Sequence, residues 1–159
     1  MIEQFKNNFF EIALFEPEIP ANTGNIIRLS ACLNVKLHLI HPIGFNFDDK
    51  HLRRAGLDYH DLAKIEHHDS AEIFFDKMKD KKIYCLTTKT ERYHWHHHFE
   101  QNCILLFGPE TRGLPSWVLQ KYQDNLLKIP MVPGARSLNL SNSVAIVSYE
   151  IARQFSIKL

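Results

Sequence analysis

The sequence predicts an α/β fold in which a mostly parallel sheet is covered by helices on both faces. Short apolar, β-rich runs alternate with helix-like segments along the chain, and such alternation is typical of parallel sheets. The segments directly after several of these runs are rich in Gly, Pro, Asn, Ser and Arg, as expected where strands end and ligands bind. The 159 residues fit a single domain, residues 1–159.

The first part of the chain predicts two strands joined by a helix. Residues 10–15 (FEIALF) form an apolar run typical of a strand, and two prolines then stiffen a loop. Asn22 and Thr23 offer N-cap chemistry for a helix that ends near Leu33. Residues 36–40 alternate in polarity, which predicts the second strand.

The middle of the chain predicts two helices and then two strands. Residues 49–55 and 70–79 have helical patterns. Residues 82–87 and 103–107 form short apolar runs, which indicate buried strands.

The last part of the chain predicts a helix, a strand and a closing helix. Residues 115–121 begin with a proline, which favours the first turn of a helix. Residues 126–129 predict the last strand, and apolar positions recur at helical spacing over residues 139–155.

Composition excludes several classes of protein. The net charge of +1 does not by itself indicate a nucleic-acid partner. Any site for a polyanion must therefore come from local clustering of positive charge or from two subunits that combine their charge. The longest apolar runs are too short to cross a bilayer, and the N-terminus has no signal-peptide pattern, so we expect a cytoplasmic protein without a membrane partner. Cys32, Cys85 and Cys103 are expected to be reduced and buried. There is no Walker sequence and no GxGxxG after the first strand.

Three polar segments carry the strongest functional signal. They are residues 22–28 (NTGNIIR), residues 105–115 (LLFGPETRGLP), and residues 129–131 (IPM) continued by 136–143 (RSLNLSNS). A glycine- and proline-rich turn by itself indicates only a rigid loop that a ligand can approach closely. In this order and spacing, however, the segments resemble the three motifs of the SPOUT-class RNA 2′-O-methyltransferases. The resemblance covers essentially the whole chain. Its length and residues 53–59 (RRAGLDY) are similar to the small members that methylate the tRNA wobble nucleotide.

This resemblance implies a fold and a cofactor. SPOUT enzymes contain a trefoil knot near the C-terminus and work as homodimers, and their knotted loops hold S-adenosyl-L-methionine (SAM) in a bent shape. By position in the motifs, the residues expected to line the SAM pocket are Leu86, Gly108, Ile129 and Ser137. Backbone hydrogen bonds and apolar contacts would bind the cofactor there.

The resemblance also places a catalytic arginine at the end of the first motif, which is Arg28. A guanidinium is practically never deprotonated in proteins, so a literal arginine base is disfavoured. We interpret Arg28 as a group that grips the phosphate next to the target and stabilises the developing alkoxide.

Other motif residues are expected to support this arginine. Asn22 would orient it, because both would lie near the start of one helix. Glu110 would pair with it or with Arg112, and Ser137 and Asn139 would supply hydrogen bonds in the third motif.

The expected RNA partner is the anticodon stem-loop of tRNA. Arginines are typical phosphate contacts, and the candidates are Arg53, Arg54, Arg112 and Arg136. The histidine-rich run at residues 93–98 (YHWHHH) has no cysteine nearby and lacks the spacing of a closed zinc site. We interpret it as a solvated loop whose rings could stack on RNA, and no metal is expected.

A dimer is also favoured by the closing helix. Its apolar positions cover more than one face, which suits a symmetric helix–helix interface. The alternative is a helix that is fully buried within its own subunit.

The sequence therefore predicts SAM-dependent 2′-O-methylation of tRNA nucleotide 34, a cytidine or a modified uridine. One alternative is 2′-O-methylation of another RNA such as rRNA, against which the lack of an N-terminal RNA-binding extension argues mildly. Another is a non-catalytic RNA-binding SPOUT protein, against which the complete motifs argue.

Overall fold

A computed structural model describes residues 9–48, 50, 52, 54 and 63–156. Its centre is a sheet with the strand order β3-β2-β1-β5-β4-β6, in which every described pairing is parallel. The strands are β1 (Phe10–Phe15), β2 (Lys36–Ile40), β3 (Lys64–His68), β4 (Ile83–Leu86), β5 (Cys103–Phe107) and β6 (Leu126–Leu127). The predicted parallel α/β architecture is confirmed.

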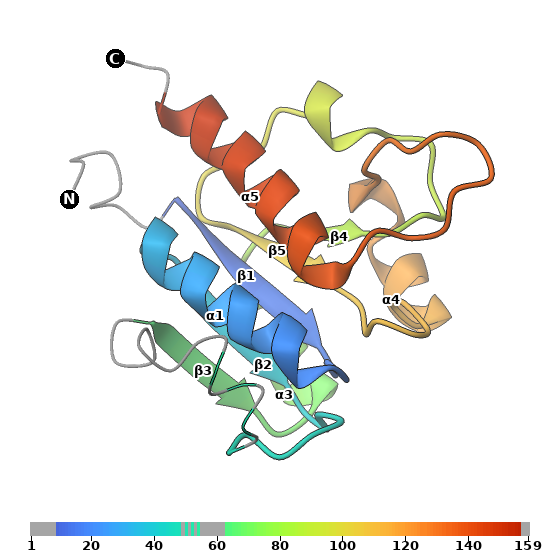
Figure 1. Ribbon diagram of the computed structural model, residues 1–159. Helices are drawn as coiled ribbons and strands as arrows, with labels where there is room; N and C mark the ends of the chain where they lie inside the picture. The colour runs from blue at the N-terminus through green and yellow to red at the C-terminus, as the bar shows by residue number, and fades with distance from the viewer. Residues whose placement is uncertain (1–8, 49, 51, 53, 55–62, 157–159) are drawn as a thin grey trace.

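Helices cover both faces of this sheet (Figure 1). α1 (Pro20–Leu33) and α5 (Leu140–Ser156) lie side by side on one face, and α3 (Ala71–Lys77) and α4 (Ser116–Lys121) lie on the other. One apolar cluster joins β-strand side chains to α1 and α5, and a second joins the opposite side chains to α3 and α4. Helices therefore cover both faces, which explains why both strands are buried at every residue, and why β5 is apolar along its whole length and β1 is apolar except at Glu11.

Most predicted elements are confirmed with small changes at their ends. β1, β2 and β5 have the predicted bounds, whereas β4, β6 and α3 are shorter than predicted. Of the helix expected over residues 49–55, only residues 50, 52 and 54 lie in the described part, and all three are helical. Two 3-10 turns, η3 (His94–His96) and η4 (Gln123–Asn125), complete the described elements.

The edge strand β3 was not predicted from the sequence. Its residues, KIEHH, lack the alternation of apolar and polar side chains that marks a half-buried strand. The pattern is absent because the inward-facing side chains of β3 are themselves polar. Glu66 and His68 contact His38 on β2, and His38 in turn contacts Glu11 on β1.

This polar network contains charges that the fold stabilises. Burial alone would raise the pKa of Glu11, but hydrogen bonds from His38 and Lys81 hold it at about 2. Desolvation likewise opposes ionisation of Glu66, and hydrogen bonds from Lys36 and Lys77 lower its pKa to about 2. Both carboxyl groups are therefore ionised at neutral pH.

The cysteines are all free, as expected, but they differ in exposure. Cys85 and Cys103 are buried in β4 and β5, and burial raises the pKa of each thiol to about 12. Cys32 is exposed on α1, so the expectation that it is buried was wrong.

The topology places a binding crevice beyond the carboxyl ends of the central strands. β1 and β5 are neighbours, yet the chain continues from β1 into α1 on one face and from β5 into α4 on the other. The loops therefore separate beyond the carboxyl ends of these two strands, where open α/β sheets bind their ligands. None of the helices in the described ranges combines the length and hydrophobicity that a bilayer crossing requires.

Candidate active site

A cavity of about 490 Å³ lies beyond the carboxyl ends of β4, β5 and β6. This volume falls in the range of about 300–1,000 Å³ that small-molecule sites occupy. Residues from the loops after all three strands line it, together with the starts of α1 and α5. Leu86, Gly108, Ile129 and Ser137, the four residues expected to bind the cofactor, all line this cavity.

The loop after β5 forms a wall of this cavity and is shaped by two glycines. A Cβ at Gly108 would lie 2.3 Å from the backbone nitrogen of Leu114, so the loop can close on itself only around a glycine. Gly113 has φ +67°, in the left-handed region, and its N–H donates to the carbonyl of Pro109 at 2.9 Å. The tight turn brings the carboxylate of Glu110 toward α1.

Glu110 caps α1 from outside the helix. Its carboxylate accepts hydrogen bonds from the backbone N–H groups of Glu18 at 2.8 Å and Ile19 at 3.1 Å. Ile19 is the N-cap residue and makes no side-chain cap of its own. A carboxylate at this position satisfies unpaired N–H groups and complements the positive end of the helix dipole. The second motif therefore fixes the start of the helix that carries the first motif.

Asn22 extends this connection to the third motif. Its side-chain amide donates to Glu110 at 3.3 Å and accepts from the Asn139 amide at 3.0 Å. Asn139 in turn accepts from the backbone N–H groups of Ser141 at 2.9 Å and Asn142 at 3.3 Å, at the start of α5. One chain of side chains, Glu110–Asn22–Asn139, thus joins the three motifs and caps two helices.

These contacts correct several expectations. Asn22 and Thr23 are not the N-cap of α1, because the helix already begins at Pro20 and both lie buried within it. Asn22 contacts two other motif residues, Glu110 and Asn139. Glu110 accepts from α1 and Asn22, and Arg112 donates to Glu16 at 2.7 Å instead.

A second pair of contacts ties the same two loops together. The backbone N–H of Thr111 donates to the Glu18 carboxylate at 3.1 Å, and its hydroxyl donates to the same carboxylate. These hydrogen bonds lower the pKa of Glu18. The loop after β1 and the loop after β5 therefore hold each other on the rim of the cavity.

Of the proposed catalytic and RNA-binding arginines that the structure describes, Arg112 alone lines this cavity. Arg28 is exposed on α1 and is not among the lining residues, and Arg54 and Arg136 are also exposed. Arg112 lines the cavity while paired with Glu16. Arg53 lies outside the described residues.

The histidine-rich run is not a solvated loop throughout. His94 is buried in η3 with its ring beside the carbonyl of Lys128, whereas Trp95 and His96 are exposed. Within the described residues, the one grouping of three metal-type ligands lies elsewhere, at His38, Glu66 and His68.

Sequence reasoning missed part of the lining, above all the segment after β4. Thr87, Thr88 and Lys89 face the cavity, as do Met131 and Leu138 from the third-motif region. The signal that could have found the first three is their position directly after a buried strand in a parallel sheet.

Fold and sequence together define the class of this protein. The chain matches the SpoU rRNA Methylase family over residues 10–149, and it belongs to that family.

Two relatives are similar over nearly their whole length, and a third shares the fold over part of its length. The tRNA (cytidine(34)-2′-O)-methyltransferase of Yersinia pestis is 51% identical over 149 residues, which cover 90% of this chain and 92% of the relative. A structure solved in work on 2′-OH methylation of C/U34 on tRNA is 38% identical, with a TM-score of 0.90, covering 96% of this chain and all of the other. The methyltransferase AviRb of Streptomyces viridochromogenes, solved with AdoMet, shares the fold with a TM-score of 0.81 at 23% identity. That comparison covers 99% of this chain and 62% of AviRb.

Proposed function

We propose that this protein transfers a methyl group from SAM to the ribose 2′-hydroxyl of nucleotide 34 in tRNA, a cytidine or a modified uridine. The observation that carries the proposal is the cavity, which residues of all three motif segments line, in a chain that belongs to the SpoU family. The names of relatives that are 51% and 38% identical supply the reaction and the RNA.

The cavity has the chemistry that SAM requires. Leu86, Ile129 and Leu138 offer apolar surface for an adenine ring, and the backbone of the loop after β5 offers hydrogen-bonding groups. Gly108 lets that backbone come close to a ligand, because no side chain stands in the way. SAM supplies an activated methyl group on its sulfonium, and the protein supplies position and electrostatics.

The protein residues act on the ribose rather than on the methyl donor. Arg28 would grip the phosphate beside the target nucleotide and stabilise negative charge as the hydroxyl loses its proton. The chain Glu110–Asn22–Asn139 holds the helix of Arg28 and the walls of the cavity in one arrangement. Its role is to position these groups.

A homodimer would complete the site. On α5, Ile146 is 41% exposed and Tyr149 is 53% exposed, whereas Val144, Val147 and Ile151 are buried in the core of the subunit. One subunit therefore leaves an apolar strip on α5 next to α1, which a second copy could cover. The exposed Arg28 would then face a site to which two subunits contribute.

The remaining features follow from membership of this family. The chain between β5 and α5 would form the trefoil knot, which suits the path of α5. This helix follows the edge strand β6 but packs on α1 at the centre of the sheet. Arg54 and Arg136 would contact the anticodon stem-loop, as would Arg53 and Arg112, and the protein would work where tRNA is processed, in the cytoplasm.

The test uses purified protein, radiolabelled SAM, bulk tRNA and bulk rRNA. We expect label in tRNA, and mapping of 2′-O-methylated positions should place it at nucleotide 34. Cells that lack the gene should have lost the same mark. Label in rRNA alone, or at another tRNA position, would contradict the proposed substrate.

A further inference from the structure

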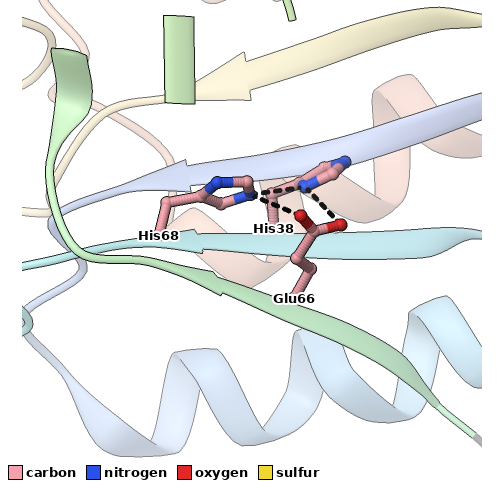
Figure 2. Close-up of side chains that lie close together, drawn as sticks. All are labelled: His38, Glu66 and His68. Carbon is pink, nitrogen blue, oxygen red and sulfur yellow. Dashed lines mark hydrogen bonds and ion pairs between the residues drawn. The ribbon is translucent and has the colours of Figure 1, made fainter. Parts of the chain in front are cut away.

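A second cluster of functional side chains lies at the other end of the sheet and takes no part in the proposed reaction. β1, β2 and β3 bring together Glu11, His38, Glu66 and His68 on the sheet face that α3 covers, and Figure 2 shows the last three of them. His38 is opposite Glu66 in the strand register. None of the four residues lines the cavity.

The two imidazole rings and the Glu66 carboxylate converge on one point. His38 Nδ1 lies 2.9 Å from His68 Nε2, and the carboxylate oxygens of Glu66 lie 4.0 Å from the first nitrogen and 3.8 Å from the second. Figure 2 shows the carboxylate reaching toward both rings. One donor atom from each residue falls within 4.8 Å of the others. The His38 side chain is fully buried and His68 nearly so.

Glu11 determines which ring nitrogen of His38 carries the proton and which has the lone pair. Its carboxylate lies 2.8 Å from His38 Nε2 and can only accept, so Nε2 carries the proton. In the neutral ring, Nδ1 then has a lone pair, which accepts a hydrogen bond from His68 Nε2–H in this structure. A cation would take the place of this proton, and His68 would then carry its proton on Nδ1. A histidine held in this way by a carboxylate is the usual arrangement around protein-bound metals.

The donor set selects the kind of metal. Two imidazole nitrogens and one carboxylate oxygen suit a zinc-class transition-metal cation, whereas magnesium and calcium prefer oxygen ligands alone. Zinc–nitrogen bonds of about 2.0–2.1 Å place tetrahedral donors about 3.3 Å apart. The observed separations bracket this value, so small side-chain movements would close the site.

In this structure, lysine ammonium groups neutralise the carboxylate that a metal cation would bind. Lys36 donates to Glu66 at 2.8 Å, and Lys77 also pairs with this carboxylate. Lys36 is 37% exposed and Lys77 is 57% exposed, so both ammonium groups can turn into water when a divalent cation replaces them. Lys81 pairs with Glu11 at 2.6 Å and can stay in place, because Glu11 is not a ligand.

We propose that this cluster is a site for one zinc-class divalent cation, with His38 Nδ1, His68 Nε2 and the Glu66 carboxylate as ligands and Glu11 as the group that orients His38. The site would fasten the edge strand β3 to β2 and β1. No metal was expected from the sequence, because the histidine-rich run at residues 93–98 lacks the spacing of a closed zinc site and has no cysteine nearby.

Cobalt titration of the full-length, untagged protein after chelator treatment tests the proposal. We expect one saturable Co²⁺ per chain with visible absorption bands of a four-coordinate site, displaced by Zn²⁺, and a Zn²⁺-dependent rise in Tm. His68→Gln and Glu66→Gln should each remove this absorption. Glu11→Gln should weaken binding by about 10–100-fold, the usual effect of losing a group that orients a ligand.

The matched control is His67→Gln. His67 lies on the same strand but on the exposed side, where its ring faces His41 at 2.8 Å. Loss of the cobalt site in this variant, or its survival in Glu66→Gln, would refute the assignment, as would the absence of a saturable site in folded wild-type protein. If His68→Gln does not fold, Glu66→Gln serves as the test by itself. The Glu66 side chain reaches solvent, so this substitution should leave the fold intact. Methyl transfer by the same preparations reports separately on the proposed function.

Discussion

Replacing Glu110 by alanine should destabilise the protein far more than the loss of an ordinary surface carboxylate. Three donors lose their acceptor: the backbone N–H groups of Glu18 and Ile19 and the amide of Asn22. Hydrogen bonds to a charged group contribute about 1.5–3 kcal/mol each when buried. Water replaces the exposed contact at Ile19 and part of the others, so we expect a total loss of about 2–4 kcal/mol.

Thermal unfolding followed by circular dichroism measures this loss. For a domain of this size each kcal/mol shifts Tm by about 2–4 °C, so Glu110→Ala should lower Tm by about 5–15 °C. Glu110→Gln keeps one acceptor oxygen and should lie between wild type and Glu110→Ala. The control is Glu100→Ala, because Glu100 is 64% exposed and forms only a 3.6 Å ion pair with Lys82. That pair should contribute about 0–1 kcal/mol.

The result that would refute this reasoning is an equal Tm for Glu110→Ala and Glu100→Ala. In that case Glu110 would not fix the start of α1, and the link between the second motif and the first would have no energetic weight.

Three further predictions concern the site loop, the catalytic arginine and the thiols. Gly108→Ala places a Cβ 2.3 Å from a backbone nitrogen, so its loop must shift. We expect about 1–3 kcal/mol of destabilisation in denaturant titrations and lost cofactor affinity. An unfolding midpoint equal to that of the wild type would contradict this. Arg28→Lys should lower kcat for tRNA methylation by about 100-fold or more with little change in KM, and normal turnover would exclude a role for the planar guanidinium. In the native protein only Cys32 should react quickly with a thiol reagent at pH 8, because Cys85 and Cys103 are buried with pKa values raised to about 12. Rapid labelling of more than one thiol would show that the core opens.

The sequence predicted the apolar elements well, because their patterns follow from burial on both faces of the sheet. β5 is a continuous apolar run and β1 is interrupted only by Glu11, and both were predicted with their correct bounds. β3 was missed because the side chains that it turns inward are Glu66 and His68, which satisfy one another through His38. A rule based on hydrophobic periodicity cannot detect a strand whose buried face is polar.

The sequence predicted residues that meet in the candidate site, but not all of the contacts between them. Motif resemblance named Glu110, Asn22 and Asn139, and these three do meet. The predicted helix cap was wrong, because Asn22 and Thr23 lie within α1, whereas the cap comes from Glu110 in a loop about ninety residues further along the chain. Such long-range caps depend on how the loops close, which local propensity does not encode.

Calorimetric titration of S-adenosylhomocysteine tests the central claim, that the cavity beyond β4, β5 and β6 holds the methyl donor. Binding of one molecule per chain is expected for wild type, and Ile129→Arg, which fills the apolar part of the cavity, should abolish it while circular dichroism shows an unchanged fold. Folded wild-type protein that takes up no ligand, or an Ile129→Arg variant that binds like wild type, would contradict this assignment.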